Sequence, residues 1–351
     1  MKLLIADFLF VKEHKDMNLN LIKSITQFAE TEIISLNGYY KEQEELLVSK
    51  RIKLTELEIY EKGGKFGLRR FSLQILKKTE AISEQKSYDA IVCLGFETTV
   101  MCFGQSLIKR APLIVFHHRN IDELTNPLKL FLFNQYKNKV YHVVFEDFFA
   151  KRLIALGVSS ERVFVIPHPV SEIKAVSTSV KYDCIGLCNS NEESFINEAI
   201  SKESEFKHNN LNVLFRSKNK SPTHGSITVV KGFLQKNQYD EIMASGKTVL
   251  VPLPTSYIYR LSGSIYDALA RRKLVLTTSM FYVKEYGRRY PGICFHVSTV
   301  ADLIEQLVRT KESSINSEAS FDKFLKEHSL ESVRDSLERM LNEIINIRLH
   351  N

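Results

Sequence analysis

The chain has 351 residues, of which 44% are hydrophobic and 25% are charged, and its formal net charge at pH 7 is +7. This length favours two domains, each large enough for a core of its own, and the composition is that of a globular protein. No apolar run approaches the roughly 20 residues that span a bilayer. The N-terminal run MKLLIADFLFVKEH meets charged residues too soon to be a signal peptide.

The five cysteines are scattered, and only Cys184 and Cys188 lie close together in the sequence. This pattern fits neither a disulfide framework nor a zinc site, so we expect reduced thiols in a cytoplasmic protein. The moderate positive charge suits anionic ligands or an anionic membrane surface, and does not by itself indicate nucleic acid.

The first half of the chain alternates between expected strands and helices. Apolar runs predict strands at residues 2–8, 32–36, 54–58, 88–94, 112–116, 140–145 and 162–166, and helical spacing predicts helices at 18–29, 42–51, 68–78 and 148–156. Gly157 is placed to end the last of these helices, and Thr98 or Thr99 to cap the helix after the fourth strand. The glycine-rich residues 63–67 lack the register of a P-loop, and fit either a surface loop or an acceptor-side loop over a cleft.

Pro167-His168-Pro169 interrupts this alternation, and the following residues are polar and poorly periodic. The alternation then restarts, with strands expected at 182–187, 211–215, 227–230, 248–251 and 273–277, and helices at 193–201, 238–244 and 300–309. Ser298 or Thr299 is placed to cap the helix at 300–309, and Ser329 to cap a last helix. We therefore expect an α/β protein with two doubly wound domains, residues 1–170 and 171–328, and a C-terminal helix at 329–351 that packs back.

The most informative stretch runs from residue 248 to residue 279, where strand, loop, helix and strand follow one another. Ser262, Gly263 and Ser264 open the helix, and Arg260 comes just before them. Unpaired amides at such a helix start, together with the helix dipole, suit a phosphate or pyrophosphate group. Asp267 lies one turn further on, where its carboxylate could accept hydrogen bonds from a ribose, or could simply be a solvated surface aspartate.

Several segments between residues 140 and 280 resemble glycosyltransferases of the GT-B fold, particularly family 4. The run VVFEDFFAKRLIALGVSSERVFVIPHPV resembles the segment that closes the N-terminal domain of that family, and Lys231-Gly232-Phe233 with Tyr239 resembles the stretch before its donor site. Arg260-Leu261-Ser262-Gly263 and Asp267-Ala268-Leu269-Ala270 resemble its donor-binding loop and helix. The resemblance implies two Rossmann-like domains facing each other across a cleft, with the acceptor on the N-terminal side and a nucleotide sugar on the C-terminal side.

The chain departs from the family pattern at several donor-site positions. Of the two glutamates that the family carries with seven residues between them, the first is replaced by Tyr259 and the second by Asp267. The family's cations after the first C-terminal strand are absent, and Arg216 and Lys218 after the next strand could replace them. By resemblance, the donor-binding residues are Arg216, Lys218, Tyr259, Arg260, Leu261, Ser262, Gly263, Ser264 and Asp267.

The activity that the resemblance implies is transfer of a hexose-type sugar, with retention of anomeric configuration, from a nucleotide diphosphate donor. A UDP-sugar is the expected donor, and no further cofactor is expected. The chain contains no Asp-x-Asp triplet, so we expect no metal site. His118 matches the family's sugar-contacting histidine, whereas its neighbour His117 could point into the fold. Glu97 could contact the acceptor or the donor, or could serve only as a charge at a helix start.

The expected acceptor is a glycan, a lipid-linked sugar or a protein-linked one, and self-association into a homo-oligomer is a further expectation. A lipid-linked acceptor would place the protein at the inner face of the cell membrane, where its positive charge suits anionic lipids. Two other functions stay open: a non-catalytic partner subunit, which the missing glutamate and cations favour, and a nucleotide-sugar 2-epimerase.

Overall fold

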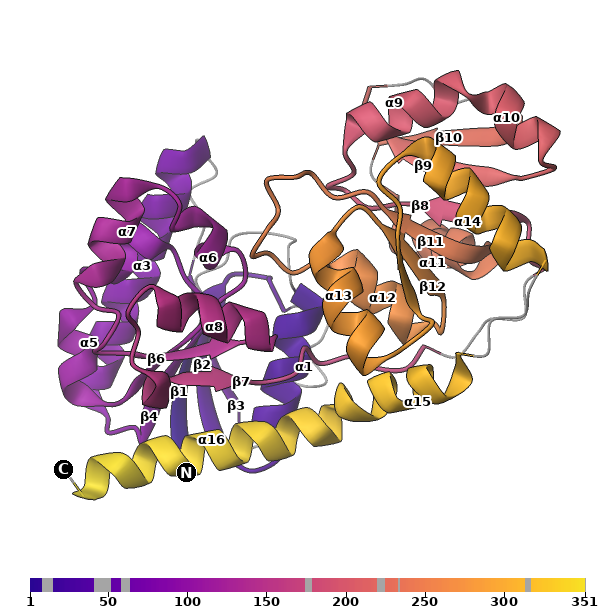
Figure 1. Cartoon of the computed structure of the whole chain (residues 1–351). Coiled ribbons are helices and arrows are strands. Elements are labelled where there is room, and N and C mark those ends of the chain that lie inside the picture. Colours follow the sequence, from indigo (N-terminus) through magenta and orange to yellow (C-terminus); the bar gives the residue numbers. More distant parts are fainter. Residues whose placement is uncertain are drawn as a thin grey trace. The chain divides into compact units, whose positions relative to one another are not determined.

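The computed structural model describes residues 1–7, 15–40, 52–57, 64–173, 179–219, 225–232, 234–312 and 317–350 (Figure 1). The helix expected at residues 42–51 lies outside these residues. The chain divides into two compact units. The first unit contains Met1–Pro169, Tyr259–Leu261 and His328–Asn351, and the second contains Val170–Ile258 and Ser262–Glu327.

The first unit is built on a parallel sheet whose seven strands run in the order β3-β2-β1-β4-β5-β6-β7. The strands are β1 (Lys2–Asp7), β2 (Glu30–Leu36), β3 (Ile52–Leu57), β4 (Ala90–Gly95), β5 (Leu113–Phe116), β6 (Tyr141–Val144) and β7 (Val163–Val165). All residues of β4, β5 and β6 are buried, as expected for central strands covered on both faces, and this explains their continuous apolar runs.

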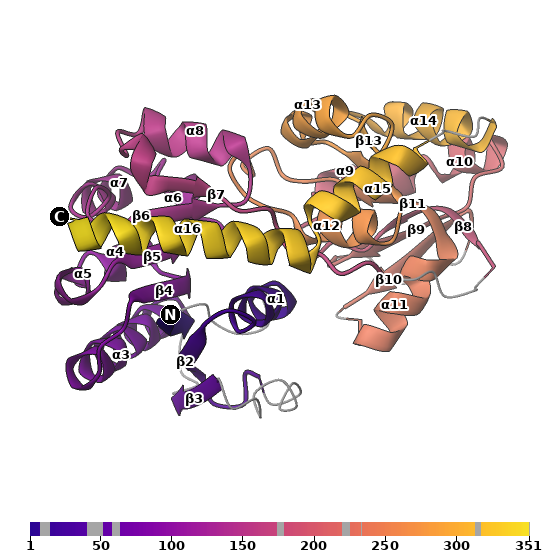
Figure 2. The ribbon, with the colours of Figure 1, turned by 90° about the horizontal axis from the view of Figure 1, so that it is seen from below.

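Helices cover both faces of this sheet (Figure 2). They are α1 (Lys15–Ile25), α3 (Gly64–Gln85), α4 (Thr98–Met101), α5 (Gln105–Arg110), α6 (Asn120–Glu123), α7 (Pro127–Asn134), α8 (Asp147–Ala155), the short 3-10 helix η2 (Ser160–Arg162) and α16 (Leu330–His350). The C-terminal helix α16 packs against α1, and Ser329 caps it by accepting a hydrogen bond from the Ser332 amide at 3.1 Å. Gly157 follows α8 with a φ of 82°, the left-handed conformation that ends many helices.

The second unit has a parallel sheet of six strands in the order β10-β9-β8-β11-β12-β13. Its strands are β8 (Tyr182–Gly186), β9 (Val213–Ser217), β10 (Ile227–Lys231), β11 (Gly246–Val251), β12 (Leu274–Thr277) and β13 (Cys294–His296). Its helices are α9 (Glu193–Ser201), α10 (Glu203–His208), α11 (Lys236–Ser245), α12 (Gly263–Ala270), α13 (Met280–Arg289), α14 (Val300–Glu312) and α15 (Glu318–Glu327). Thr299 caps α14 as expected, because its side-chain oxygen accepts from the Asp302 amide at 3.1 Å.

Two local expectations were wrong. The expected glycine-rich loop at residues 63–67 is largely helical, because α3 begins at Gly64. The helix after β4 is capped by Glu97 and not by Thr98 or Thr99, since the Glu97 carboxylate accepts from the Thr99 and Val100 amides at 2.9 Å each. A glutamate side chain is long enough to reach back to the first turn, and its charge is favourable at that end of the helix dipole.

Candidate functional site

The strand order marks one point in the second sheet where a ligand can be held. The chain leaves β8 toward β9 on one side and later enters β11 on the other, so the loops after β8 and β11 diverge at the carboxyl ends of these neighbouring strands. The two loops are joined where the Glu192 amide donates to the Pro252 carbonyl at 2.7 Å. Asn191 ties the first loop to β9, donating to the carbonyls of Gly186 at 3.1 Å and Arg216 at 3.3 Å.

The N-terminus of α12 opens at this point. The Ser262 amide donates to the Tyr282 hydroxyl at 2.9 Å, and the Ser262 side chain makes no capping hydrogen bond to the described residues. Gly263 is exposed, has no left-handed φ, and a Cβ added there would meet no described heavy atom within 4 Å. The fold itself therefore leaves space over the first turn of α12, beside Ser264.

Asp267, one turn into α12, is held by two side chains. Its Oδ2 accepts from the Tyr239 hydroxyl at 2.7 Å, and its Oδ1 accepts from Arg271 Nε at 3.2 Å. Burial raises the pKa of Tyr239 well above its ordinary value, and the Asp267 carboxylate raises it further. Burial alone would lower the pKa of Arg271, but the carboxylates of Asp267 and Asp240 outweigh it and raise that pKa. Asp267 is thus held in position by two donors, with a quarter of its side chain still exposed.

Arg216 lies near the same network. Its guanidinium is half-buried at the end of β9, and burial lowers its pKa, against the opposing influence of Cys188, Glu193 and Tyr239. Lys218 is exposed, and its amide donates to Glu193 at 3.0 Å. The structure therefore brings Arg216 and Asp267 to the same group of neighbours and places Lys218 further out on the β9 loop.

Three of the expected donor residues, Tyr259, Arg260 and Leu261, belong to the first unit. Asp122, just after β5, accepts from the Tyr259 amide at 2.6 Å and from Arg260 Nε at 3.2 Å. The Arg152 guanidinium lies 5.3 Å from the centre of the Tyr259 ring. Leu261 is buried. The expected donor-binding residues therefore belong to two different units. The Arg260 guanidinium is paired with a carboxylate of the first unit.

Both histidines after β5 are buried. His118 Nε2 lies 2.5 Å from the Leu94 carbonyl, so this nitrogen carries the proton and donates it. His117 Nε2 lies 2.8 Å from His142 Nδ1, and His142 Nε2 lies 2.7 Å from the Lys137 carbonyl. Burial lowers the pKa of His117 well below its ordinary value, and the neighbouring imidazoles lower it further. His117 thus points into the fold and stays neutral.

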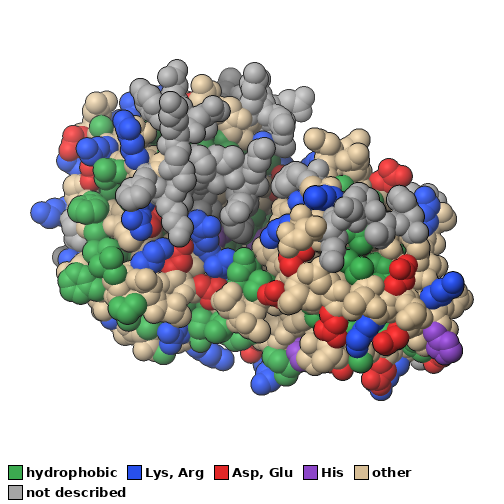
Figure 3. Space-filling model, turned by 90° about the horizontal axis from the view of Figure 1, so that it is seen from above, with side chains coloured by type: hydrophobic (Ala, Val, Ile, Leu, Met, Phe, Trp, Pro, Cys, Tyr) green, Lys and Arg blue, Asp and Glu red, His purple; other side chains and the backbone are tan. Residues whose placement is uncertain are grey.

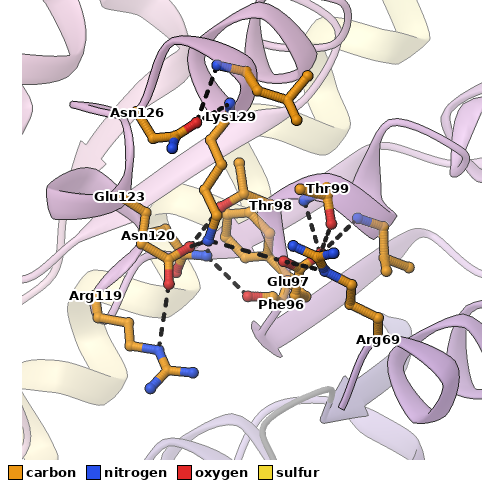
Figure 4. Close-up of polar contacts among 12 residues, drawn as sticks. Arg69, Phe96, Glu97, Thr98, Thr99, Arg119, Asn120, Glu123, Asn126 and Lys129 are labelled. Carbon is orange, nitrogen blue, oxygen red and sulfur yellow. Dashed lines mark hydrogen bonds and ion pairs between the residues drawn. The ribbon is translucent and has the colours of Figure 1, made fainter. Parts of the chain in front are cut away.

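Glu97 belongs to a charged cluster at the carboxyl ends of β4 and β5, which also contains Arg69, Arg119, Glu123 and Lys129 (Figure 4). Lys129 Nζ lies 2.6 Å from Glu123 and 4.0 Å from Glu97 Oε1. Arg69 Nε lies 3.8 Å from the same Glu97 oxygen. Glu97 Oε2 serves as the helix cap, whereas Oε1 has only these longer ion-pair contacts among the interactions that the structure describes.

The sequence did not identify several residues that hold these groups in place. Asp122 is 138 residues from Arg260, and Tyr239 is 28 residues from Asp267. Lys129 sits in an apolar helix that carried no expected function. One of these contacts had a signal in the sequence: the i,i+4 spacing of Asp267 and Arg271 on a helix indicates an ion pair between them.

Among the described residues, no three His, Cys, Asp or Glu side chains gather in an arrangement that could hold a metal ion. No helix in the part of the chain that the structure describes is long and apolar enough to cross a membrane.

No protein-family model and no curated protein sequence matches the chain. Solved structures match it over nearly its full length. HepE from Anabaena, in complex with UDP and glucose, aligns with a TM-score of 0.70 at 11% identity, covering 97% of this chain and 99% of HepE. A glycosyltransferase from Rickettsia africae aligns with a TM-score of 0.67 at 13% identity, covering 98% of each chain. A UDP-N-acetylglucosamine 2-epimerase from Rickettsia bellii aligns with a TM-score of 0.62 at 12% identity, covering 99% of this chain and 97% of the epimerase.

These alignments confirm the expected fold class: the chain has the GT-B fold, with parallel sheets of seven and six strands. At such low identity they show the fold alone. Membership of glycosyltransferase family 4 stays a prediction.

Proposed function

We propose that the protein is a glycosyltransferase that uses a nucleotide diphosphate sugar, with a UDP-sugar as donor. The observation that carries this proposal is the open N-terminus of α12, where Gly263 leaves unfilled space beside a carboxylate that is held in place. The GT-B fold supports it, because HepE, which shares that fold, has been solved with UDP and with UDP-glucose.

The donor diphosphate would lie over the amides of Gly263 and Ser264, where the helix dipole favours negative charge. Arg216 is the cation best placed to add to this attraction, because it shares its neighbours with the Asp267 network. Asp267 would accept hydrogen bonds from the ribose hydroxyls, since its remaining exposed surface can receive them. In this proposal Lys218 has a secondary role on the β9 loop. Arg260 shares its charge with Asp122 through Nε, so we give it a secondary role toward the diphosphate.

The first unit would supply the acceptor side and the contacts to the transferred sugar. Glu97 Oε1 can accept a hydrogen bond from a sugar hydroxyl, because its contacts to Arg69 and Lys129 are 3.8 and 4.0 Å long. His118 is fixed as the Nε2–H tautomer by the Leu94 carbonyl, so in the neutral ring Nδ1 is the accepting atom. We assign to these two residues the sugar contacts of a retaining transfer to a glycan, a lipid-linked sugar or a protein-linked one.

In such a reaction the bond between the anomeric carbon and an oxygen of the donor diphosphate breaks, the acceptor oxygen forms the new bond to that carbon, and the acceptor proton passes to the leaving diphosphate. The leaving diphosphate gains negative charge as the sugar becomes oxocarbenium-like, so the enzyme must stabilise the diphosphate. The α12 amides and Arg216 would provide this stabilisation without a metal ion.

The proposal is tested by thermal unfolding in the presence of UDP, GDP, dTDP, ADP or CMP, each with and without EDTA. A ligand at about 100 times its Kd should stabilise the folded protein by about 2.7 kcal/mol. We expect UDP to raise the melting temperature equally with and without EDTA. Asp267→Asn should abolish this shift. Asp322→Asn is the matched control, because Asp322 is also an aspartate of the second unit that is paired with an arginine, Arg272.

Three results would redirect the proposal. No response to any nucleotide would favour the non-catalytic partner subunit. Interconversion of UDP-N-acetylglucosamine with its C2 epimer, without transfer, would favour the epimerase. A product whose anomeric configuration, measured by NMR, is inverted relative to the donor would refute the retaining mechanism alone.

A further inference from the structure

Helix α7 (Pro127–Asn134) has an unusual surface for its composition. Its sequence, PLKLFLFN, is almost entirely apolar, yet Phe133 is its only buried residue. Leu128 and Phe131 are 64% and 61% exposed, and their i,i+3 spacing places them on one face of the helix. A helix that is apolar nearly all round is normally buried.

A second exposed aromatic side chain lies close to this helix in the fold. Phe103 follows α4, which packs against α7, and is 68% exposed. Among the phenylalanines whose exposure the structure describes, only Phe103 and Phe131 are exposed. We call Phe103, Leu128 and Phe131 the α7 surface. Figure 3 shows exposed hydrophobic side chains among Lys and Arg side chains on the first unit.

The chain around the α7 surface is strongly basic. Between Thr98 and Val140 there are six Lys or Arg residues and two Asp or Glu residues, a net charge of +4 out of +7 for the whole chain. Both acidic residues are engaged, since Asp122 pairs with Arg260 and Glu123 pairs with Lys129. Among the cations, Lys109 and Lys139 are exposed, and Arg110 is also exposed but pairs with Glu84 of α3 at 2.8 Å.

We propose that the α7 surface docks the protein on an anionic lipid bilayer. Exposed Phe and Leu side chains enter the boundary between headgroups and acyl chains, and surrounding Lys and Arg side chains are attracted to anionic headgroups. The charge argues against a second copy of this chain as the occupant, because two such surfaces facing each other would repel. A bilayer offers both the apolar phase and the opposite charge.

The position of α7 gives this docking a consequence. Lys129 extends from α7 to Glu123 and Glu97, so the helix connects the α7 surface to the charged cluster around Glu97. An acceptor carried by a lipid would thus reach that cluster from the membrane. This consequence depends on the proposed function, whereas the docking itself does not require nucleotide binding.

Vesicle co-sedimentation of the full chain tests the docking. We expect binding to vesicles of phosphatidylcholine mixed with phosphatidylglycerol, little binding to phosphatidylcholine alone, and a decrease as the salt concentration rises. Leu128→Ser with Phe131→Ser should weaken binding at least about tenfold, since each side chain loses a favourable transfer from water. The matched control is Ile154→Ser with Val180→Ser, at two exposed apolar positions outside α7, in α8 and before β8, which are 44% and 63% exposed. It should bind as the unmodified chain does.

A fluorescent reporter gives an independent readout, because the chain contains no tryptophan. Phe131→Trp places a single indole on the α7 surface, and Met280→Trp places one on α13, where Met280 is 47% exposed. On addition of anionic vesicles, the emission of the first should shift to shorter wavelength and be quenched by brominated lipids, and that of the second should not change.

Equal binding of the Leu128→Ser, Phe131→Ser variant and the unmodified chain would overturn the proposal, as would unchanged emission from Trp at position 131. A dimer seen by sedimentation velocity without vesicles, and abolished by the same double variant, would instead assign the surface to a second copy. An unchanged melting temperature and UDP response would show that the double variant is folded. A failure of UDP to bind the unmodified chain would count against the proposed function and leave the docking untouched.

Discussion

The buried pair His117 and His142 should make the first unit sensitive to mild acid. His142 Nε2–H donates to the Lys137 carbonyl, so its Nδ1 must accept from His117 Nε2–H, and both rings are neutral. Burial lowers the pKa of His142 from its ordinary 6.5 to about 4, and the pKa of His117 is also well below its ordinary value. Because the folded-state pKa values are depressed, stability is complete above about pH 6.5 and is lost as the pH falls toward 4.

The size of the effect follows from these pKa values. In the unfolded chain each imidazole takes up a proton near pH 6.5, whereas in the folded chain it stays neutral at pH 5. Each histidine therefore lowers the free energy of unfolding by about 2 kcal/mol when the pH falls from 7 to 5. His117→Gln should remove one such contribution, since a Gln amide can donate to His142 Nδ1 as the imidazole does but does not titrate.

The assay is native-state amide exchange of β5 and β6 at pH 7 and pH 5, corrected for the intrinsic effect of pH on exchange. All other ionisable groups are common to both proteins. The contribution of His117 is therefore the difference between the decreases in unfolding free energy that the two proteins show from pH 7 to pH 5. We expect the free energy of unfolding to decrease by about 2 kcal/mol more in the unmodified chain than in His117→Gln. Equal losses would refute the assignment of a neutral, buried pair.

Three further outcomes are expected. Tyr239→Phe should weaken UDP binding about tenfold, because one hydrogen bond that positions the ribose-binding carboxylate is lost, and should leave binding of 2′,3′-dideoxy-UDP unchanged in calorimetry. Glu97→Ala should lower the stability of the first unit by about 1 to 2 kcal/mol through loss of the α4 cap, measured by urea unfolding. Gly246→Ala should destabilise the second unit by about 1 to 3 kcal/mol, because the new Cβ would meet Ile185 atoms at 2.7 to 2.8 Å. Gly287→Ala, which meets no described atom within 4 Å, is its control in the same unfolding experiment.

The two-sheet architecture was predictable because the buried strands of parallel sheets are short apolar runs separated by helical spacing. The sequence around β11 and α12 shows both signals, and Pro252 and Pro254 mark the end of the strand. Helix α13 was missed although Tyr282, Tyr286 and Tyr290 recur every four residues. Tyr286 and Tyr290 pack on Phe324 of α15, and Tyr282 packs on Tyr286. The polar-looking helix is therefore stabilised by a partner that is remote in the sequence.

The candidate site was only partly predictable for a similar reason. The sequence could indicate a helix start at Ser262 and a carboxylate one turn later, because these are local features. It could not show that Asp122 holds Arg260, or that Tyr239 holds Asp267, since those contacts form only after the strands have been ordered in each sheet. It also could not show that α7 is exposed, because an apolar run of this length is more often buried.

Calorimetric titration of UDP into the unmodified chain and into Gly263→Ala and Gly287→Ala is the most direct test of the central claim, that the N-terminus of α12 holds the donor diphosphate. Neither new methyl group meets a described atom of the protein within 4 Å, so both variants should fold normally. We expect Gly263→Ala to lose UDP binding and Gly287→Ala to keep it, because only the first methyl group lies where the diphosphate would approach. UDP binding that is equal in all three proteins would contradict the claim.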